Sequence, residues 1–565
     1  MTLRTGFVQR PARLAAAGAR DKPGQWLFCR IGEPMRLGLA GLALSALVIT
    51  AFWAWLGIPV AMPHAPLKPG QKLYCISYAP FHGQQTPLDL STHISAEQID
   101  HDLGQLAQLT DCVRTYSSDF GLDQIAGIAA RHGLKVIQGL WLSGKSDYNR
   151  TQIETTVALA KRYPGTIKAV VVGNETLLRG EMSGDSLAAI MREVKSRIPE
   201  PVTYADVWEF WLRNPQVASA ADFITIHILP YWEDFPIAAA NAAAHVEAIR
   251  LKVAAAFPGK EILIGEVGWP SAGRMREGAL PSPVNQARVI QDVLALAARE
   301  NFRVNLIEAY DQPWKRALEG TTGGHWGLIG DARRQFKFFW GEPLSDHPLW
   351  LWQMLAGLAL AAIVFGVAYL AGRKNARPSA WIAVTGNAIS GGALIGWTVA
   401  NVPIESLGVG GWLRSCALAA VALLSAPVVS AAIMRGEPIP RFSKLLGPAG
   451  QRIQDPLALA VGGLLIATIL LGVVTALGLV FDPRYKDFPF APLTAAAVPF
   501  LLHTLTMPRP VGARGTSELL AAALLALSAL YIVFDESLAN WQALWLCAAL
   551  LALAVTLAQV RDARS

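Results

Sequence analysis

The chain has 565 residues, of which 53% are hydrophobic and only 16% are charged, and its mean hydropathy is positive. This composition excludes a single water-soluble globule and implies membrane segments. The net charge of +7 is unevenly spread: residues 62–346 contain 28 Lys and Arg against 31 Asp and Glu, and the rest of the chain contains 21 against 11. Because the basic excess flanks apolar segments, it indicates membrane topology and not a nucleic-acid surface.

The N-terminal region changes character near residue 36. Residues 1–36 are irregular and basic, and residues 37–62 form a nearly uncharged apolar segment that is long enough to span a bilayer. This segment is longer than the apolar core of a cleaved signal peptide, so we expect an uncleaved signal anchor. Its basic flank predicts an N-terminus in the cytoplasm and a following domain on the other side of the membrane.

Residues 63–346 alternate short β-branched runs with amphipathic stretches, and the alternation occurs eight times. The predicted strands are 73–78, 112–116, 134–141, 167–173, 202–207, 223–229, 262–267 and 304–310. Helical patterns lie between them, such as residues 95–109, which open with a Ser-x-x-Gln capping box, and residues 284–299. Eight such units over roughly 250 residues predict an α/β fold, the TIM (β/α)8 barrel, whose active residues lie at strand C-terminal ends.

Residues 347–565 return to apolar segments. We predict seven further spans, at residues 349–371, 380–402, 412–434, 457–481, 488–507, 518–534 and 541–560. The loops that we assign to the cytoplasm contain Arg373, Lys374 and Arg377, then Arg435, Arg441, Lys444 and Arg452, then Arg509 and Arg514, with Arg561 and Arg564 in the tail. The intervening loops are neutral or acidic. Eight spans therefore place both termini in the cytoplasm and the barrel outside, which is the periplasm in a bacterial envelope.

The five cysteines show no CxxC spacing and have no His cluster nearby, so we expect no metal site. Cys75 and Cys112 lie on neighbouring predicted strands in an oxidising compartment, where a disulfide is feasible. If Tyr78 and Arg114 both face inward, however, alternation puts the two cysteines on opposite faces, which disfavours the bond.

Two of the predicted strands end in a glutamate. Residues 168–175 (KAVVVGNE) carry Glu175 to a strand tip, and residues 262–271 (ILIGEVGWPS) do the same for Glu266, because Gly, Trp and Pro stop the second strand. Such a carboxylate pair is typical of enzymes that cleave or transfer sugars, since one carboxyl protonates the leaving oxygen and the other attacks or activates water. A lone Asn-Glu at a strand end is often only an exposed carboxylate or a helix cap, and the second motif is what favours catalysis.

Residues 171–175 and 265–271 resemble the acid/base and nucleophile motifs of glycoside hydrolase family 17, the β-1,3-glucanases and β-1,3-glucan transglucosylases. Further matches follow in the expected order at residues 76–78 (ISY), 113–116 (VRTY), 230–231 (PY), 308–315 (EAYDQPWK) and 325–327 (HWG). The resemblance covers the barrel, about half of the chain, and does not extend to the later spans.

The resemblance implies a retaining mechanism with Glu175 as general acid/base and Glu266 as nucleophile. Glu175 then needs a raised pKa, and Glu266 must stay ionised. By analogy the substrate-binding residues are Asn174 at the sugar 2-hydroxyl, Tyr78 in the first-strand motif, Tyr231 orienting Glu266, Trp269 as an aromatic floor, and Glu308 and Lys315 as polar ligands. No cofactor is implied.

Several of these roles have structural alternatives. Trp269 can simply pack the barrel mouth, and Arg114 more often pins strands or orients a carboxylate than touches substrate. His227 departs from the residues that are frequent in the family, which leaves its role open. Sugar stacking and packing are both open for three further tryptophans, Trp141, Trp208 and Trp211.

Hydrolase and transglucosylase share the first half-reaction, and the motifs do not separate them. A barrel tethered by eight spans suits the remodelling of a glucan made at that membrane, and membrane-bound bacterial family members with this layout are linked with periplasmic cyclic β-1,3;1,6-glucan synthesis. We therefore favour transfer, by β-1,6 branching or β-1,3 elongation, with a glucan acceptor and a membrane glucan synthase as partners. The alternatives are a tethered β-1,3-glucanase and a glucan exporter or scaffold with an accessory barrel. The lack of Asp-x-Asp and Gln-x-x-Arg-Trp motifs disfavours a synthase.

Overall fold

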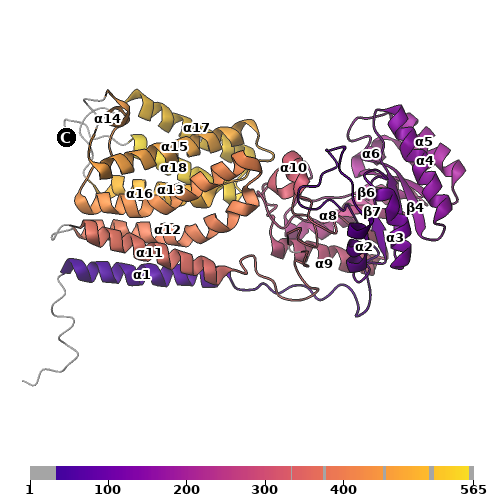
Figure 1. Cartoon of the computed structure of the whole chain (residues 1–565), viewed down its shortest axis with the longest axis horizontal. Helices are drawn as coiled ribbons and strands as arrows, with labels where there is room; N and C mark the ends of the chain where they lie inside the picture. Colours follow the sequence, from indigo (N-terminus) through magenta and orange to yellow (C-terminus); the bar gives the residue numbers. More distant parts are fainter. Residues whose placement is uncertain (1–32, 333, 373–376, 449–452, 508–514, 559–565) are drawn as a thin grey trace, which may run out of the picture.

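The structure is a computed structural model that describes residues 33–332, 334–372, 377–448, 453–507 and 515–558. It has two parts, a barrel and a bundle of long helices, and the barrel lies against one end of the bundle (Figure 1). Residues 1–32 of the predicted basic N-terminus lie outside the described residues. So do seven predicted cytoplasmic charges, Arg373, Lys374, Arg452, Arg509, Arg514, Arg561 and Arg564.

Eight parallel strands close the barrel, each beside the next in chain order. They are β1 (Cys75–Ser77), β2 (Cys112–Arg114), β3 (Lys135–Leu140), β4 (Ile167–Asn174), β5 (Val202–Val207), β6 (Ile224–His227), β7 (Ile262–Val267) and β8 (Arg303–Leu306). The predicted (β/α)8 barrel is confirmed. The last strand is shorter than predicted because Glu308 has a positive φ of 58°, a backbone conformation that does not continue a strand.

The barrel helices are α2 (Ala96–Leu106), α3 (Ile125–Arg131), α4 (Ser146–Arg162), α5 (Gly184–Arg197), α6 (Trp208–Arg213), α7 (Pro215–Ala220), α8 (Ala242–Ala256), α9 (Pro283–Glu300) and α10 (Arg316–Gly323). Ser95 caps α2 by accepting a hydrogen bond from the backbone N–H of Gln98 at 3.2 Å, as the sequence predicts. The Gln98 side chain donates instead to the carbonyl of Pro80 and to Gln85, so only half of the predicted capping box forms.

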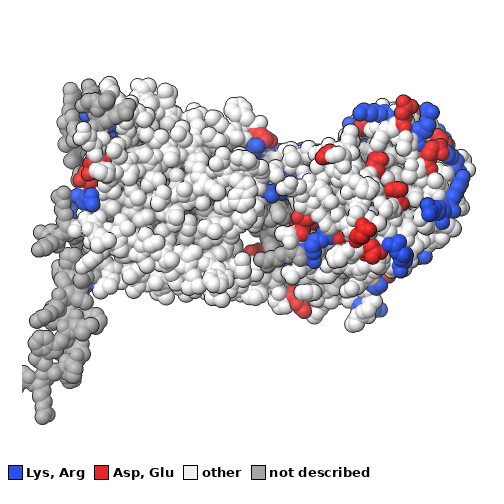
Figure 2. Space-filling model, in the orientation of Figure 1, with Lys and Arg blue, Asp and Glu red and all other residues white. Residues whose placement is uncertain are grey.

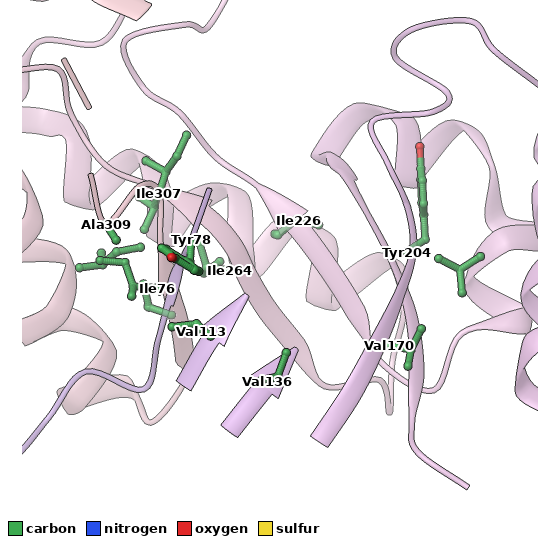
Figure 3. Packing of buried hydrophobic residues seen from close by; sticks show 14 of the residues in the cluster. Ile76, Tyr78, Val113, Val136, Val170, Tyr204, Ile226, Ile264, Ile307 and Ala309 are labelled. Carbon is green, nitrogen blue, oxygen red and sulfur yellow. The ribbon is translucent and has the colours of Figure 1, made fainter. Parts of the chain in front are cut away.

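The two faces of each strand pack differently. Outward side chains such as Ile76, Val113 and Val170 form the apolar layer between strands and helices (Figure 3). Tyr78 belongs to this outer layer, and its hydroxyl donates to Asp102 of α2 at 3.1 Å. The inward face holds small and apolar side chains together with polar ones that hydrogen-bond to each other, such as Thr203 with Thr225 and Asn305 with Ser77. The inward arginine, histidine and glutamate (Arg114, His227 and Glu266) lie at or next to the last residue of their strands.

Cys75 and Cys112 form a disulfide, contrary to the prediction from alternation. The parallel register pairs Ile76 with Val113 and therefore sets the two cysteines opposite each other. The error lay in placing Tyr78 inside the barrel: because Tyr78 points outward, Cys75 points inward, as Cys112 does.

The bundle contains α1 (Glu33–Leu56), α11 (Trp350–Ala371), α12 (Pro378–Glu405), α13 (Gly408–Arg435), α15 (Pro456–Phe481), α16 (Phe490–Thr506), α17 (Thr516–Glu536) and α18 (Trp541–Ala558), with the short α14 (Phe442–Leu446). Within the described ranges, seven of these are long and apolar enough to cross a membrane, and α16 is a shorter apolar helix of 17 residues. One candidate span precedes the barrel and the others follow it. All eight predicted apolar segments are thus helical. The helix α1 ends six residues before the predicted end of its segment, and the other ends that can be compared lie within four residues of the prediction.

The barrel is an insertion between α1 and α11. Its entering and leaving chains meet at Val60 and Leu344, which exchange backbone hydrogen bonds of 2.8 and 3.1 Å. The three loops predicted to share the barrel's side of the membrane all contact the barrel, through Ser406, Asp487 and Asn540. In the view of Figure 2 the middle of the bundle shows almost no charged side chains, whereas the barrel surface shows many. This distribution matches an apolar bundle with a polar domain at one end.

Candidate active site

The tip of β4 places Asn174 and Glu175 at the barrel mouth. The register between β4 and β5 shifts between Val171 and Asn174, and Gly173 adopts a positive φ of 85° there. The shift turns Asn174 towards the barrel axis. Glu175 itself has a φ of 51°, a conformation that is uncommon for residues other than glycine and is found at functional sites. Its side chain is 26% exposed and can reach a bound substrate.

The tip of β7 carries Glu266. Here too the register shifts, between Ile264 and Val267, and this brings Glu266 to the inner face. Gly265 is required beside it, because a Cβ there would lie 2.3 Å from the Cγ2 of Thr225. The side chain of Glu266 is only 7% exposed, so the two carboxylates differ in their access to solvent.

His227, at the end of β6, lies between the two carboxylates. Its Nδ1 is 2.8 Å from Oε1 of Glu175, and its Nε2 is 3.6 Å from Oε1 of Glu266. One oxygen from each carboxylate and one ring nitrogen all lie within 4.8 Å of one another. The structure therefore brings together the two predicted carboxylates, and it gives the open residue His227 a direct contact with Glu175.

Arg114 joins the two strand tips and is almost completely buried. Its Nη1 donates to Oε1 of Glu266 at 2.7 Å and to the carbonyl of Gly265 at 3.1 Å, and its Nη2 donates to the side-chain oxygen of Asn174. Arg114 thus orients a carboxylate, as the structural alternative proposed. Because the Asn174 oxygen accepts from Arg114, its amide N–H groups are the part of that side chain left to bind a ligand.

Tyr116 is a site residue for which the sequence analysis gave no role. Its hydroxyl donates to Oε1 of Glu266 at 2.9 Å. The family resemblance implies the orienting role for Tyr231, but the hydroxyl of Tyr231 instead donates to the carbonyl of Arg274 at 2.9 Å. The sequence does indicate that Tyr116 faces the site, because Tyr116 lies two residues after Arg114 and alternation puts both side chains on the same side of the predicted strand.

These contacts favour the ionised form of Glu266. Burial alone would raise the pKa of this carboxyl, but the charges of His227, Arg114 and Lys315 and the hydroxyl of Tyr116 outweigh it and hold the pKa well below its usual value. The expectation of an ionised Glu266 agrees with this environment.

Glu308 and Lys315 form an ion pair beside the site, through Nζ of Lys315 and Oε1 of Glu308. Burial raises the pKa of Glu308 to about 7, against the attraction of the Lys315 ammonium. The Lys315 side chain is 20% exposed and Glu308 only 3%. Lys315 is therefore the partner that can meet a ligand.

Tyr78 and Trp269 do not line the site as expected. Tyr78 is covered between the barrel and α2, so it has no exposed surface for a sugar. Trp269 is also fully buried, and its Nε1 donates to the carbonyl of Leu280 at 3.0 Å. The rings of Trp269 and Tyr231 form a T-shaped pair with centroids 6.0 Å apart, which agrees with the alternative that Trp269 packs the barrel mouth.

Two of the other tryptophans, Trp211 and Trp141, differ from each other in how far they are buried. Trp211 is buried and donates to the carbonyl of Thr225 at 2.8 Å, which is a packing role. Trp141 is half-buried, and the guanidinium of Arg179 lies 4.1 Å from its ring centre. A sugar could therefore reach at most the remaining surface of Trp141.

The cluster of Glu175, His227 and Glu266 has the residue types of a metal site. Arg114 and Lys315 already supply positive charge to Glu266, however, and a further cation there would be repelled. The arrangement fits two carboxylates with separate roles in acid/base chemistry better than it fits metal binding.

Comparison with known proteins agrees with this geometry. Residues 75–327 match the family model of the BtgE/BtgC glycoside hydrolase domain. A glucan 1,3-beta-glucosidase of Saccharomyces cerevisiae is 25% identical over 257 residues, which are 42% of this chain and 82% of the yeast protein. A putative glucan endo-1,3-beta-glucosidase of Aspergillus niger is 26% identical over 290 residues, 46% of this chain and 42% of the relative.

The similarity of the barrel to the BtgE/BtgC glycoside hydrolase domain and to curated glucan 1,3-beta-glucosidases supports its assignment to glycoside hydrolase family 17. A crystal structure of a family 17 β-1,3-glucanosyltransferase from Rhizomucor miehei aligns with 47% of this chain and 96% of its own, at 24% identity and a TM-score of 0.42. The family match ends at residue 327 and so leaves the C-terminal helices outside it.

Proposed function

We propose that this protein is a membrane-anchored, retaining β-1,3-glucan transglucosylase. The observation that carries the proposal is the carboxylate pair, in which oxygens of Glu175 and Glu266 lie within 4.8 Å. Retaining glycosidases separate their carboxyl groups by about 5–5.5 Å, whereas inverting ones need about 6.5–9.5 Å to admit a water. The names of the relatives, glucan 1,3-beta-glucosidases, supply the substrate class.

In the first half-reaction, protonated Glu175 donates its proton to the glycosidic oxygen while the carboxylate of Glu266 attacks the anomeric carbon. The bond to the leaving glucan breaks, and a covalent glucosyl-enzyme forms on Glu266. Arg114 and Tyr116 keep Glu266 ionised and aimed at the substrate. Asn174 offers its amide N–H groups to the sugar 2-hydroxyl.

In the second half-reaction, the carboxylate of Glu175 accepts the proton of an acceptor hydroxyl, whose oxygen attacks the anomeric carbon and releases Glu266. A second glucan as acceptor gives transfer, and water gives hydrolysis. The apolar bundle supports transfer, because a barrel held at a membrane suits the remodelling of a glucan produced there. β-1,6 branching or β-1,3 elongation of a periplasmic glucan, next to a membrane glucan synthase, is the corresponding role.

A time course on β-1,3-linked oligoglucosides tests this proposal, with the full chain purified in detergent micelles. Product lengths come from mass spectrometry, and linkages and first-formed anomers from NMR. Products longer than the substrate with the β configuration are expected, and a 1,6 linkage would identify branching. Only shorter products would make the protein a tethered glucanase, and no turnover would leave the accessory-barrel alternative.

Two variants, each of which replaces one glutamate of the β7 region by glutamine, form a test and its matched control. Glu266→Gln should lower the rate more than about a thousandfold, because the nucleophile is lost. Glu261→Gln, at the opposite end of the same strand, removes an exposed carboxylate that pairs with Arg303 and should retain activity.

A further inference from the structure

The helix α10 lies on the side of the barrel that faces the helical bundle (Figure 1). On its inner side, Lys315 precedes the helix and is close enough to lower the pKa of Glu266 by its charge. Glu319, one turn further on, interacts electrostatically with Lys315 and with both Glu175 and Glu266. One side of this short segment therefore belongs to the electrostatic environment of the candidate active site.

The other side of α10 is bound to the bundle. Nη2 of Arg316 donates to the carbonyls of Ile404 and Ser406, at 2.6 and 2.9 Å, where α12 ends. The hydroxyl of Thr321 donates to Oδ2 of Asp487 at 2.6 Å, in the loop between α15 and α16. Thr321 and Asp487 are both buried, so water does not compete for this bond.

Gly320 allows the close contact between α10 and the helical bundle. It interrupts α10 with a φ of 69°, and a Cβ at this position would lie 2.3 Å from the backbone oxygen of Tyr485. Any other residue would be strained here and would push α10 away from the bundle. The close packing of α10 against the loop that contains Tyr485 therefore depends on both segments keeping their positions.

The bundle side of the contact is itself fixed. Burial raises the pKa of Asp487, and the hydrogen bond from Thr321 and three nearby arginines, Arg414 of α13 and Arg274 and Arg316 of the barrel, act against this rise. Arg274 in turn pairs with Glu536 at the end of α17. A charge network therefore ties the loop that holds α10 to two further helices.

We propose that the helical bundle positions the catalytic pair through α10, with Asp487 as the positioning residue that holds Lys315 and Glu319 in place. The bundle is then a part of the enzyme's machinery as well as an anchor. This inference rests on the proposed function for its catalytic consequence.

The test uses the full chain in lipid nanodiscs and two variants on the bundle side of α10. Thr321→Val keeps the shape of the side chain but removes the hydrogen bond to Asp487, and Gly320→Ala introduces the clash with Tyr485. Each should lower kcat on β-1,3-linked oligoglucosides about ten- to a hundredfold with little change in KM, since a displacement near 1 Å has effects of that order. Thr151→Val, at an exposed threonine of α4, is the matched control.

The pH profile separates positioning from loss of structure. Displacement of Lys315 removes one of the charges that lower the pKa of Glu266, so that pKa rises. The acid limb of kcat/KM should therefore move to higher pH in both variants and stay unchanged in the control. Wild-type rates and an unchanged acid limb in both variants would overturn the inference.

Hydrogen–deuterium exchange of residues 313–324 gives a readout that needs no turnover. Uptake should rise in Thr321→Val and not in Thr151→Val, and equal uptake in all three proteins would also overturn the inference. If the wild type acts on no glucan, the proposed function fails, while the exchange data still decide whether the bundle holds α10.

Discussion

Glu266 receives two hydrogen bonds from the end of β2, a strand that does not pair with β7: one comes from Arg114 and one from Tyr116. We expect Tyr116→Phe to lower kcat/KM at least about tenfold, because a hydrogen bond to a charged group contributes about 1.5–3 kcal/mol. The hydroxyl lowers the pKa of Glu266, so its removal raises that pKa, and the acid limb of the kcat/KM profile should move to higher pH. Initial rates between pH 3 and 8 measure both effects.

Tyr163→Phe is the control for this variant, because Tyr163 ends α4 next to the start of β4, at the opposite end of the barrel. An acid limb that stays in place in Tyr116→Phe would show that another group sets it.

His227 contacts Glu175, the proposed general acid, so the effect of replacing His227 should depend on the leaving group. Loss of its hydrogen bond to Glu175 in His227→Ala should slow turnover of oligoglucosides by about a hundredfold, within the range for general acid catalysis. A dinitrophenyl glucoside needs no protonation, so its rate of enzyme glucosylation should change little. Pre-steady-state release of dinitrophenol compares the two, and an equal loss on both substrates would indicate that His227 acts on Glu266 instead.

The barrel and its carboxylate pair could be predicted from the sequence because both depend on local patterns. β-Branched runs that stop at Gly or Pro mark strand tips, and Glu175 and Glu266 lie at two of them. The orientation of Tyr78 and Tyr231 could not be predicted in the same way. Alternation alone does not tell which set of side chains of a short, fully buried strand faces inward, and Tyr78 shares the outer side of β1 with Ile76. Tyr231 lies beyond the end of β6, where alternation no longer applies.

The disulfide joins β1 and β2 at the inner base of the barrel and closes a segment with a sequence separation of 37. Replacing both Cys75 and Cys112 by alanine should destabilise the barrel by about 3–4 kcal/mol, since the bond limits the unfolded chain. Its thermal unfolding temperature, measured by calorimetry, should fall, while activity at low temperature stays near the wild-type value because the bond lies far from the strand tips.

Cys416→Ala is the matched variant for this experiment, because Cys416 is an exposed free cysteine of α13. An unchanged unfolding temperature in the double variant would show that the unfolded chain gains little freedom when the bond is absent.

The charge pattern of the loops predicts the orientation of the whole molecule. With Cys29, Cys416 and Cys547 replaced by alanine, Leu90→Cys on the barrel should react with a membrane-impermeant maleimide in intact spheroplasts, since Leu90 is 89% exposed. Lys444→Cys, in α14 at the other end of the bundle, should react only after lysis. Labelling in the reverse order would contradict the predicted topology.

The pairing of Val60 with Leu344 shows that the barrel is an insertion after the first helix, and this fixes the order of events during biosynthesis. When the ribosome finishes the barrel, α1 is the only one of the described bundle helices that has already been synthesised. Ser406, Asp487 and Asn540, against which the barrel docks, are all synthesised later. Under the proposed topology, the barrel therefore crosses the membrane with its docking face uncovered, and it meets its final neighbours only after the last pair of helices has been inserted.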